Sequence, residues 1–159
     1  MKGNFQMKIS VMGIDYNQLL SGKVLAEMGN EVTYISQDNK RVDNIKRGYY
    51  NADEAMVIKS IDIENSVGFT TNIKEALSNS NMCFISEGYI EGNEDHMQHV
   101  LNTAKEVGAN MSHDMFIVDR SGISHSRVEE IKETIQEELS KRNAGFSFEI
   151  IANPDFLRA

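Results

Sequence analysis

Short apolar runs alternate with amphipathic, helix-like stretches along the whole chain. Strands are predicted where the apolar runs are bounded by glycine or polar residues, over residues 8–12, 31–35, 67–70, 82–85, 116–118 and 146–151. Helices are predicted between them, over residues 16–28, 39–46, 53–59, 73–77, 95–107 and 127–142. Gly29, Gly48 and Gly108 each stand where a predicted helix stops, and glycine is favoured just after a helix C-terminus.

Alternation of strands and helices predicts βαβ units with right-handed crossovers. We therefore expect an α/β fold with a Rossmann-like, doubly wound, mainly parallel sheet of about six strands. Residues 7–159 are predicted to form this single domain, and the polar residues 1–6 are predicted to be a disordered lead. Ligands of such sheets bind at the carboxyl ends of the strands, so the loops that follow the strands are where a binding site is expected.

The last predicted helix, residues 127–142, is the longest. Side-chain pairs at helical spacing support it: Ser126 with Glu129 as a capping box, and Glu137 with Lys141 and Glu138 with Arg142 as ion pairs.

The composition of the chain excludes several classes of function. The 159 residues are 40% hydrophobic and 25% charged, as in ordinary globular proteins, and the formal net charge is -8. This acidic balance argues against nucleic acid or an anionic membrane as the main partner, because both require a basic surface. Cys83 is the only cysteine, which excludes an internal disulfide. No apolar run approaches the roughly 20 residues of a membrane span, and residues 1–6 have no signal-peptide core, so we expect a cytoplasmic protein.

The first strand-to-helix loop carries the most specific signal. Residues 13–18, Gly-Ile-Asp-Tyr-Asn-Gln, stand where a G-x-G-x-x-G turn would stand, and the run from Leu19 to Thr33 follows it. Further segments agree in order and spacing: Phe-Thr-Thr-Asn at 69–72, Asp-Arg-Ser-Gly at 119–122 and Asn-Pro-Asp-Phe-Leu-Arg at 153–158. Together they resemble the N-terminal NAD-binding domain of the UDP-glucose/GDP-mannose (nucleotide-sugar) 6-dehydrogenase family.

The resemblance implies an NAD site built from residues that follow the strands. The positions that match the family's cofactor contacts are Gly13, Ile14, Asp15, Tyr16, Ser36, Gly88 and Ser121. Several of them are altered. Asp15 and Gln18 replace the second and third glycines of the motif, and Ser36 stands where the family has the acidic residue that holds the adenosine ribose.

Asp15 is the most informative alteration. A carboxylate at a helix N-terminus caps free N–H groups, which stabilises the helix by about 1 kcal/mol. Those N–H groups are the ones that a pyrophosphate would use. At an effective dielectric constant of 20, a carboxylate about 4 Å from a phosphate costs on the order of 4 kcal/mol. We interpret Asp15 as a helix cap that fills the phosphate site; the alternative is a shifted or cation-bridged dinucleotide.

Other reactive side chains are interpreted as structural. Cys83, within an apolar strand, is predicted to be a buried core thiol, and most of the nine methionines are predicted to fill the core. His96 and His99 are three residues apart on a predicted helix, where a solvated polar face is favoured over a metal site. Neither His113 nor His125 is assigned as a general base, because no nucleophile or hydride partner is identifiable beside it.

Two functional hypotheses follow. In the family that the chain resembles, the nucleophilic cysteine lies in a later domain, so this chain is not expected to be a complete oxidoreductase alone. The first hypothesis is a noncatalytic interaction or regulatory protein with weak NAD binding. The second is a residual NAD- or nucleotide-binding domain that acts with a separate catalytic partner. Either way we expect a protein partner or a homo-oligomer, and the sequence could also be a fragment of a longer product.

Overall fold

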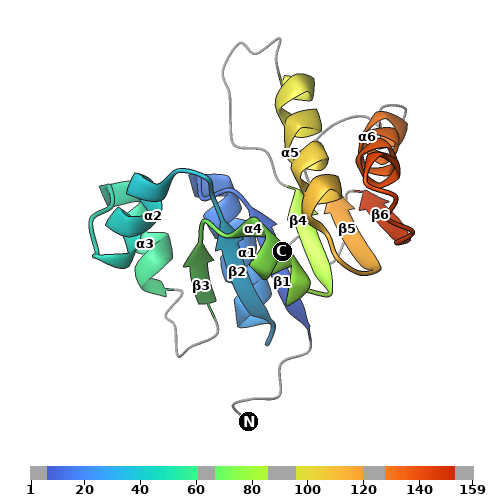
Figure 1. Ribbon diagram of the computed structural model, residues 1–159. Coiled ribbons are helices and arrows are strands. Elements are labelled where there is room, and N and C mark those ends of the chain that lie inside the picture. Colours follow the sequence, from blue (N-terminus) through green and yellow to red (C-terminus); the bar gives the residue numbers. More distant parts are fainter. Residues whose placement is uncertain (1–6, 61–66, 86–95, 120–127, 153–159) are drawn as a thin grey trace.

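The computed structural model describes residues 7–60, 67–85, 96–119 and 128–152, and its strands form one sheet (Figure 1). The strands are β1 (Lys8–Met12), β2 (Glu31–Ile35), β3 (Val67–Thr70), β4 (Met82–Ile85), β5 (Met115–Asp119) and β6 (Phe148–Ala152). The helices are α1 (Tyr16–Glu27), α2 (Asn39–Lys46), α3 (Ala52–Ser60), α4 (Ile73–Ser78), α5 (His96–Asn110) and α6 (Val128–Lys141).

The sheet has the order β3-β2-β1-β4-β5-β6, and every pairing in it is parallel. The chain thus starts in the centre, runs to one edge, and returns to build the other half. The predicted Rossmann-like, doubly wound fold is confirmed. Met12 is in register with Ile35 of β2 and Ile85 of β4, so these strands end at one level. The loops that follow β1 and β2 are therefore neighbours, beside the point where the strand order reverses.

Each face of the sheet has its own core, because successive side chains of a strand point to opposite faces. In β4, Phe84 packs into the core beneath α1, α2 and α3, whereas Cys83 and Ile85 pack into the core beneath α4, α5 and α6. All four residues of β4 are buried, which explains its continuous apolar sequence. Both cores consist mainly of aliphatic side chains.

Gly22 brings α1 close to β2. A Cβ atom on Gly22 would lie 2.1 Å from the hydroxyl oxygen of Tyr34, a fully buried residue of β2. The Tyr34 hydroxyl donates a 2.7 Å hydrogen bond to the Leu19 carbonyl, and its ring stacks on Phe69 at 5.0 Å between centroids. Because Gly22 has no side chain, the ring of Tyr34 can pack directly against α1.

The prediction that α5 ends at Gly108 was wrong. The helix continues to Asn110, so within the described residues α5 has 15 residues and α6, which was expected to be the longest helix, has 14. Gly108 lies where α5 crosses α6, and a Cβ there would approach the Ile135 carbonyl oxygen to 2.8 Å. Glycine is therefore needed for close helix packing at this point, whereas Gly29 and Gly48 do have the positive φ of helix-ending residues.

The ion pairs predicted on α6 are confirmed in part. Lys141 lies 3.4 Å from Glu137, as expected, and 2.9 Å from Glu138. Arg142 donates instead to the carbonyl oxygens of Gly108 and Met111, at 2.8 and 2.9 Å, and so ties α6 to the end of α5. Carbonyls near a helix C-terminus lack intrahelical partners, which makes them good acceptors for a guanidinium group.

Several expectations lie outside the described residues: the lead at 1–6, the capping box at Ser126, and the site residues Gly88 and Ser121. Within the described part of the chain, no helix is both long and apolar enough to cross a membrane.

Candidate functional site

A pocket of about 400 Å³ opens at the carboxyl ends of β1 and β2. It lies between the N-terminus of α1, the start of α2 and one face of α5. Its lining is formed by Met12, Gly13, Ile14, Asp15, Gln18, Ile35, Ser36, Gln37, Asp38, Arg41, His99, Asn102, Thr103 and Glu106. This is where doubly wound sheets bind their ligands.

The loop between β1 and α1 forms one side of the pocket. Gly13 has a φ of 113°, a conformation that favours glycine, and its N–H donates to the Ile35 carbonyl at 2.7 Å. A Cβ atom on Gly13 would lie only 2.2 Å from Oε1 of Gln18. The Gln18 side chain therefore already occupies the space above this glycine.

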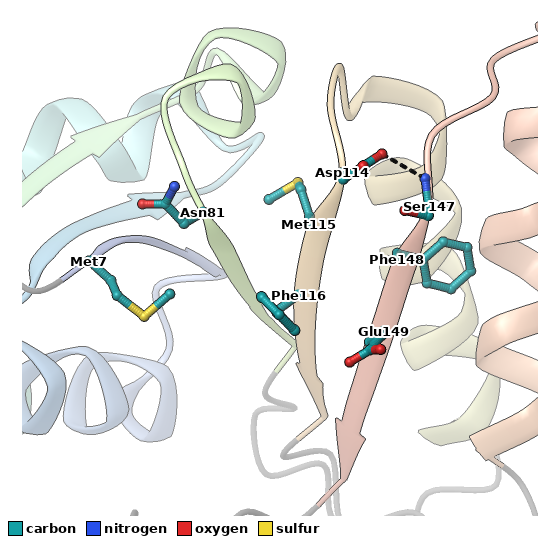
Figure 2. A pocket seen from close by; sticks show the side chains of 8 residues that line it. All are labelled: Met7, Asn81, Asp114, Met115, Phe116, Ser147, Phe148 and Glu149. Atoms are coloured by element: carbon teal, nitrogen blue, oxygen red, sulfur yellow. Dashed lines mark hydrogen bonds between the residues drawn. The ribbon is translucent and has the colours of Figure 1, made fainter.

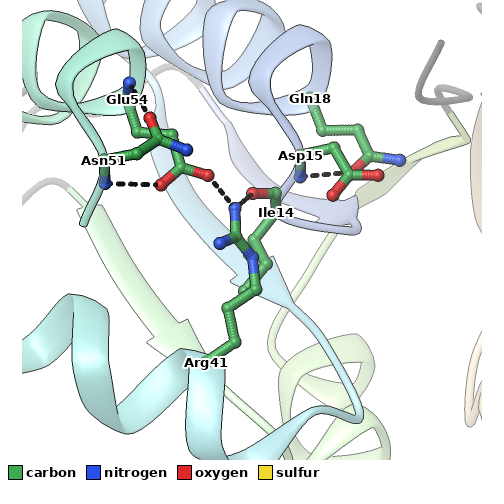
Figure 3. A network of polar contacts seen from close by, with 6 residues as sticks. All are labelled: Ile14, Asp15, Gln18, Arg41, Asn51 and Glu54. Atoms are coloured by element: carbon green, nitrogen blue, oxygen red, sulfur yellow. Dashed lines mark hydrogen bonds and ion pairs between the residues drawn. The ribbon is translucent and has the colours of Figure 1, made fainter. Parts of the chain in front are cut away.

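The side chains of Asp15 and Gln18 accept hydrogen bonds from backbone N–H groups at the N-terminus of α1 (Figure 3). Asp15 is the N-cap residue, as predicted, and it forms a capping box with Gln18. In that box the Asp15 N–H donates to Oε1 of Gln18 at 2.8 Å. Gln18 is 6% exposed although it is polar, because its carboxamide is held by this bond against the loop. We call Gly13, Asp15 and Gln18 the phosphate side of the pocket.

Arg41 fastens this loop to two helices, as Figure 3 shows. Its Nη2 atom donates to the Ile14 carbonyl at 2.7 Å and pairs with the Glu54 carboxylate. Glu54 is buried and forms a reciprocal capping pair with Asn51 at the start of α3. Arg41 Nε is also buried and has no hydrogen-bond partner among the described residues. The charge of Arg41 is thus compensated inside the protein.

The opposite side of the pocket is polar, and we call Ser36, Gln37, Asn102 and Thr103 its polar side. The Ser36 hydroxyl accepts from the N–H of Asp38, which is the N-cap residue of α2. On α5, the Thr103 hydroxyl donates to the carbonyl of His99 one turn earlier.

Glu106 joins α5 to the loop that follows β2. Its carboxylate accepts a 2.5 Å hydrogen bond from Gln37 Nε2, and desolvation by burial raises the pKa of Glu106 above its ordinary value. The pocket wall also contains Asp15 and Asp38, so three carboxylates and Arg41, the single arginine or lysine among the described lining residues, contribute to it. That cation is already paired with Glu54, so the pocket is acidic overall.

The structure brings together part of the predicted site. Gly13, Ile14, Asp15 and Ser36 line one pocket. Tyr16 begins α1 with 45% of its surface exposed, and it is not among the lining residues.

Sequence reasoning missed Arg41 and the lining residues from α5. The spacing Asn51-x-x-Glu54 is a capping pattern that could have indicated a helix start there. Nothing in it showed that Arg41 would bind Glu54.

Two of the other reactive side chains, Cys83 and His113, have structural roles. Cys83 is fully buried, as predicted, and burial raises the pKa of its thiol to about 12. Nε2 of His113 lies 2.7 Å from the Ser80 carbonyl oxygen, which fixes the loop before β5. The described residues contain no cluster of three or more side chains suited to a metal ion.

A larger cavity of about 650 Å³ lies at the opposite, amino ends of the strands (Figure 2). Met7, Asn81, Phe116 and Glu149 contribute to its wall, and Asp114 beside them accepts from the Ser147 N–H at 2.8 Å. Among the described residues, its wall contains the carboxylates of Asp114 and Glu149, and the cavity lies at the end of the sheet opposite to where Rossmann folds bind their ligands.

Comparisons with known proteins agree with this geometry. Residues 7–159 match the model of the UDP-glucose/GDP-mannose dehydrogenase family, NAD binding domain. UDP-glucose 6-dehydrogenase of Pseudomonas aeruginosa is 29% identical over 159 residues, covering 96% of this chain and 35% of that protein. UDP-glucose 6-dehydrogenase TuaD of Bacillus subtilis is 27% identical over 156 residues, covering 95% of this chain and 33% of its own length. The chain thus spans about a third of the curated relatives that it matches.

A solved UDP-glucose dehydrogenase from the archaeon Pyrobaculum islandicum superimposes with a TM-score of 0.78 at 20% identity. It covers 99% of this chain, which covers 38% of that structure. At 20% identity the superposition shows that the two proteins share a fold. The match of residues 7–159 to the family model shows that this chain belongs to the same family. The chain therefore belongs to the UDP-glucose/GDP-mannose dehydrogenase family, in which residues 7–159 correspond to the NAD-binding domain.

Proposed function

We propose that this domain is a noncatalytic member of its family, which acts through protein interaction or regulation and binds NAD only weakly. One observation carries the proposal: the phosphate side of the pocket is closed by the chain's own side chains. Gln18 covers Gly13, and Asp15 caps the helix that would receive a pyrophosphate.

The charge of the pocket also disfavours the binding of a dinucleotide. Asp15, Asp38 and Glu106 face the pocket, and Arg41 is engaged by Glu54. A carboxylate about 4 Å from a phosphate costs about 1 kcal/mol in bulk water and about 4 kcal/mol at an effective dielectric constant of 20. Asp15 is exposed, so its contribution lies between these limits. Even the lower limit weakens a dinucleotide severalfold.

The pure 159-residue chain should not oxidise UDP-glucose with NAD. Its one cysteine, Cys83, is buried in β4 with a raised thiol pKa, which leaves no accessible thiolate as a nucleophile. The measurement is NADH absorbance with the pure protein, NAD and UDP-glucose. Steady NADH production that requires the sugar nucleotide would contradict the proposal.

The alternative function is a residual nucleotide-binding domain that works with a separate catalytic protein. The pocket itself favours this alternative, because about 400 Å³ remains at the carboxyl ends of β1 and β2. Titration with NADH, monitored by nicotinamide fluorescence, distinguishes the nucleotide-binding function from the noncatalytic one. A dissociation constant in the low micromolar range, about -8 kcal/mol or better, would favour the nucleotide-binding function over the noncatalytic one.

Association with itself or with another protein is the third part of the proposal. Several large apolar side chains are exposed, among them Met56 at 79% and Tyr49 at 69%. The expected contact surface is the strand-end side near residues 87–90 and 153–159, which lie outside the described residues. Sedimentation velocity of the pure chain should show an oligomer, or a monomer that shifts on adding its partner. A monomer at high concentration with a polar strand-end face would contradict the expectation.

A further inference from the structure

An aromatic ring is exposed in the interior of the sheet. Met115 and Ile117 of β5 pack into the core beneath α4, α5 and α6, so Phe116 between them points to the other face. The helices of that other face, α1, α2 and α3, make their main contacts with one another and with β1, β2 and β3 (Figure 1). Phe116 is therefore 42% exposed, although parallel sheets are normally covered on both faces.

An unpaired carboxylate lies beside this ring, in the cavity of about 650 Å³ that we call the amino-end cavity. Glu149 is in register with Phe116 on the neighbouring strand, so both side chains point to the same side of the sheet (Figure 2). The Glu149 carboxylate is exposed and has no hydrogen bond or ion pair within the described residues. Asp114, by contrast, accepts from the Ser147 N–H. The cavity thus suits an occupant with an apolar side chain and a cation.

The described part of the chain begins at the wall of this cavity. Met7 lines the cavity, and its carbonyl accepts from the Glu31 N–H at 2.9 Å, so residue 7 continues the line of β1. In the strand order, β6 is three places from β1, a distance of about 14 Å at roughly 4.8 Å per strand. The five residues before Met7 span on the order of 17 Å when extended. This segment is therefore long enough to cross β4 and β5 and reach Glu149.

Residues 1–6, Met-Lys-Gly-Asn-Phe-Gln, carry the side chains that the cavity requires. Residues two apart in an extended chain point to the same side, so Phe5 follows Met7 toward the cavity. Lys2 is the only lysine or arginine of the segment, and its ammonium group ends a flexible stem of four carbons. We propose that residues 1–6 bind across the amino ends of β4 and β5, with Phe5 packed on Phe116 and Lys2 paired with Glu149.

A second copy of the chain suits this cavity less well. Two copies that met face to face here would bring two Glu149 carboxylates together, and each copy carries a net charge of -8. The proposal concerns the opposite end of the sheet from the candidate ligand pocket, so it does not depend on the proposed function. It replaces the expectation of a disordered lead, which used only the polarity of residues 1–6.

A single tryptophan tests the binding of the segment. The chain contains no tryptophan, so Phe5→Trp in the 159-residue chain introduces one indole that fluorescence can follow. In the folded chain this indole should emit at a shorter wavelength, and acrylamide should quench it severalfold less than in the urea-unfolded chain, because it is buried against Phe116. Both signals should be independent of protein concentration. Quenching equal to that of the unfolded chain would overturn the proposal, as would protection that appears only at high concentration, which indicates a second copy.

Charge reversal tests the partner of Lys2. In the Phe5→Trp chain, Glu149→Lys should weaken the docking severalfold and so raise acrylamide quenching. Adding Lys2→Glu should restore the protection, because the ion pair is then rebuilt with its charges exchanged. Glu133→Lys is the matched control: Glu133 is an exposed glutamate of α6 outside the cavity lining, so this variant changes the net charge equally and should leave the protection unchanged.

A thermal melt of each variant shows whether it is folded. If Glu149→Lys does not fold, Glu149→Gln replaces it, because glutamine keeps the shape of the side chain and removes the charge. Added salt should raise the quenching of the Phe5→Trp chain in the same direction, since it screens the ion pair. Equal quenching in the folded Glu149 variant and in the Glu133→Lys control would overturn Glu149 as the partner of the segment.

Discussion

Replacing Asp15 and Gln18 together by glycine should strengthen the binding of NAD to this domain by roughly a hundredfold. The double change removes a carboxylate from the phosphate side and clears the carboxamide that lies above Gly13. It also frees N–H groups at the start of α1, and hydrogen bonds from such groups to a charged ligand contribute about 1.5–3 kcal/mol each.

Fluorescence titration with NADH measures the change, with wild-type chain and double variant compared at the same ionic strength. The variant loses a capping box and gains a helix glycine, so its stability should fall by about 1–2 kcal/mol. A thermal melt therefore accompanies each titration to show that the variant is folded. Lys23→Ala on the same helix, away from the pocket lining, is the control and should leave binding unchanged. A folded double variant with wild-type affinity would show that the phosphate side is not what limits NAD binding.

Gly22→Ala should destabilise the protein by about 2 kcal/mol, although alanine is the better helix former by about 1 kcal/mol. The new methyl group would lie 2.1 Å from the Tyr34 hydroxyl and 2.4 Å from the ring carbon that bears it. The Tyr34 ring is fully buried and stacked on Phe69, so it has little room to move. For a chain of this length the melting temperature should fall by roughly 4–8 °C.

Urea unfolding measures the loss, with Gly145→Ala as the matched control. A Cβ on Gly145 meets nothing within 4 Å, and the residue is exposed, so this variant should stay near wild-type stability. Adding Tyr34→Phe to Gly22→Ala should not restore stability, because the ring carbons remain in the way. A Gly22→Ala protein as stable as the wild type would mean that α1 can lift away from β2 at little cost.

The strand pattern, the fold class and the family were predictable from sequence because they depend on local periodicity and on short motifs. The apolar run of β4 indicated a strand buried on both faces, and Cys83 within it is a core residue, as predicted. Asp15 before an apolar helical run indicated an N-cap. Each of these inferences uses residues within a few positions of one another, where spacing alone fixes which side chains meet.

Only the tertiary structure decided which distant residues meet. Arg41 reaches Ile14, 27 residues earlier, and Arg142 reaches the Gly108 carbonyl, 34 residues earlier. Local rules instead predicted that Arg142 pairs with Glu138 and that Gly108 ends its helix. Both predictions were wrong for one physical reason: where α5 and α6 pack closely, Gly108 stays inside the helix and the free carbonyls at its end bind the guanidinium group. The sequence by itself thus determined the fold, the altered loop and the helix cap at Asp15, whereas packing between distant segments determined that Arg41 holds this loop and that α5 completes the wall of the pocket.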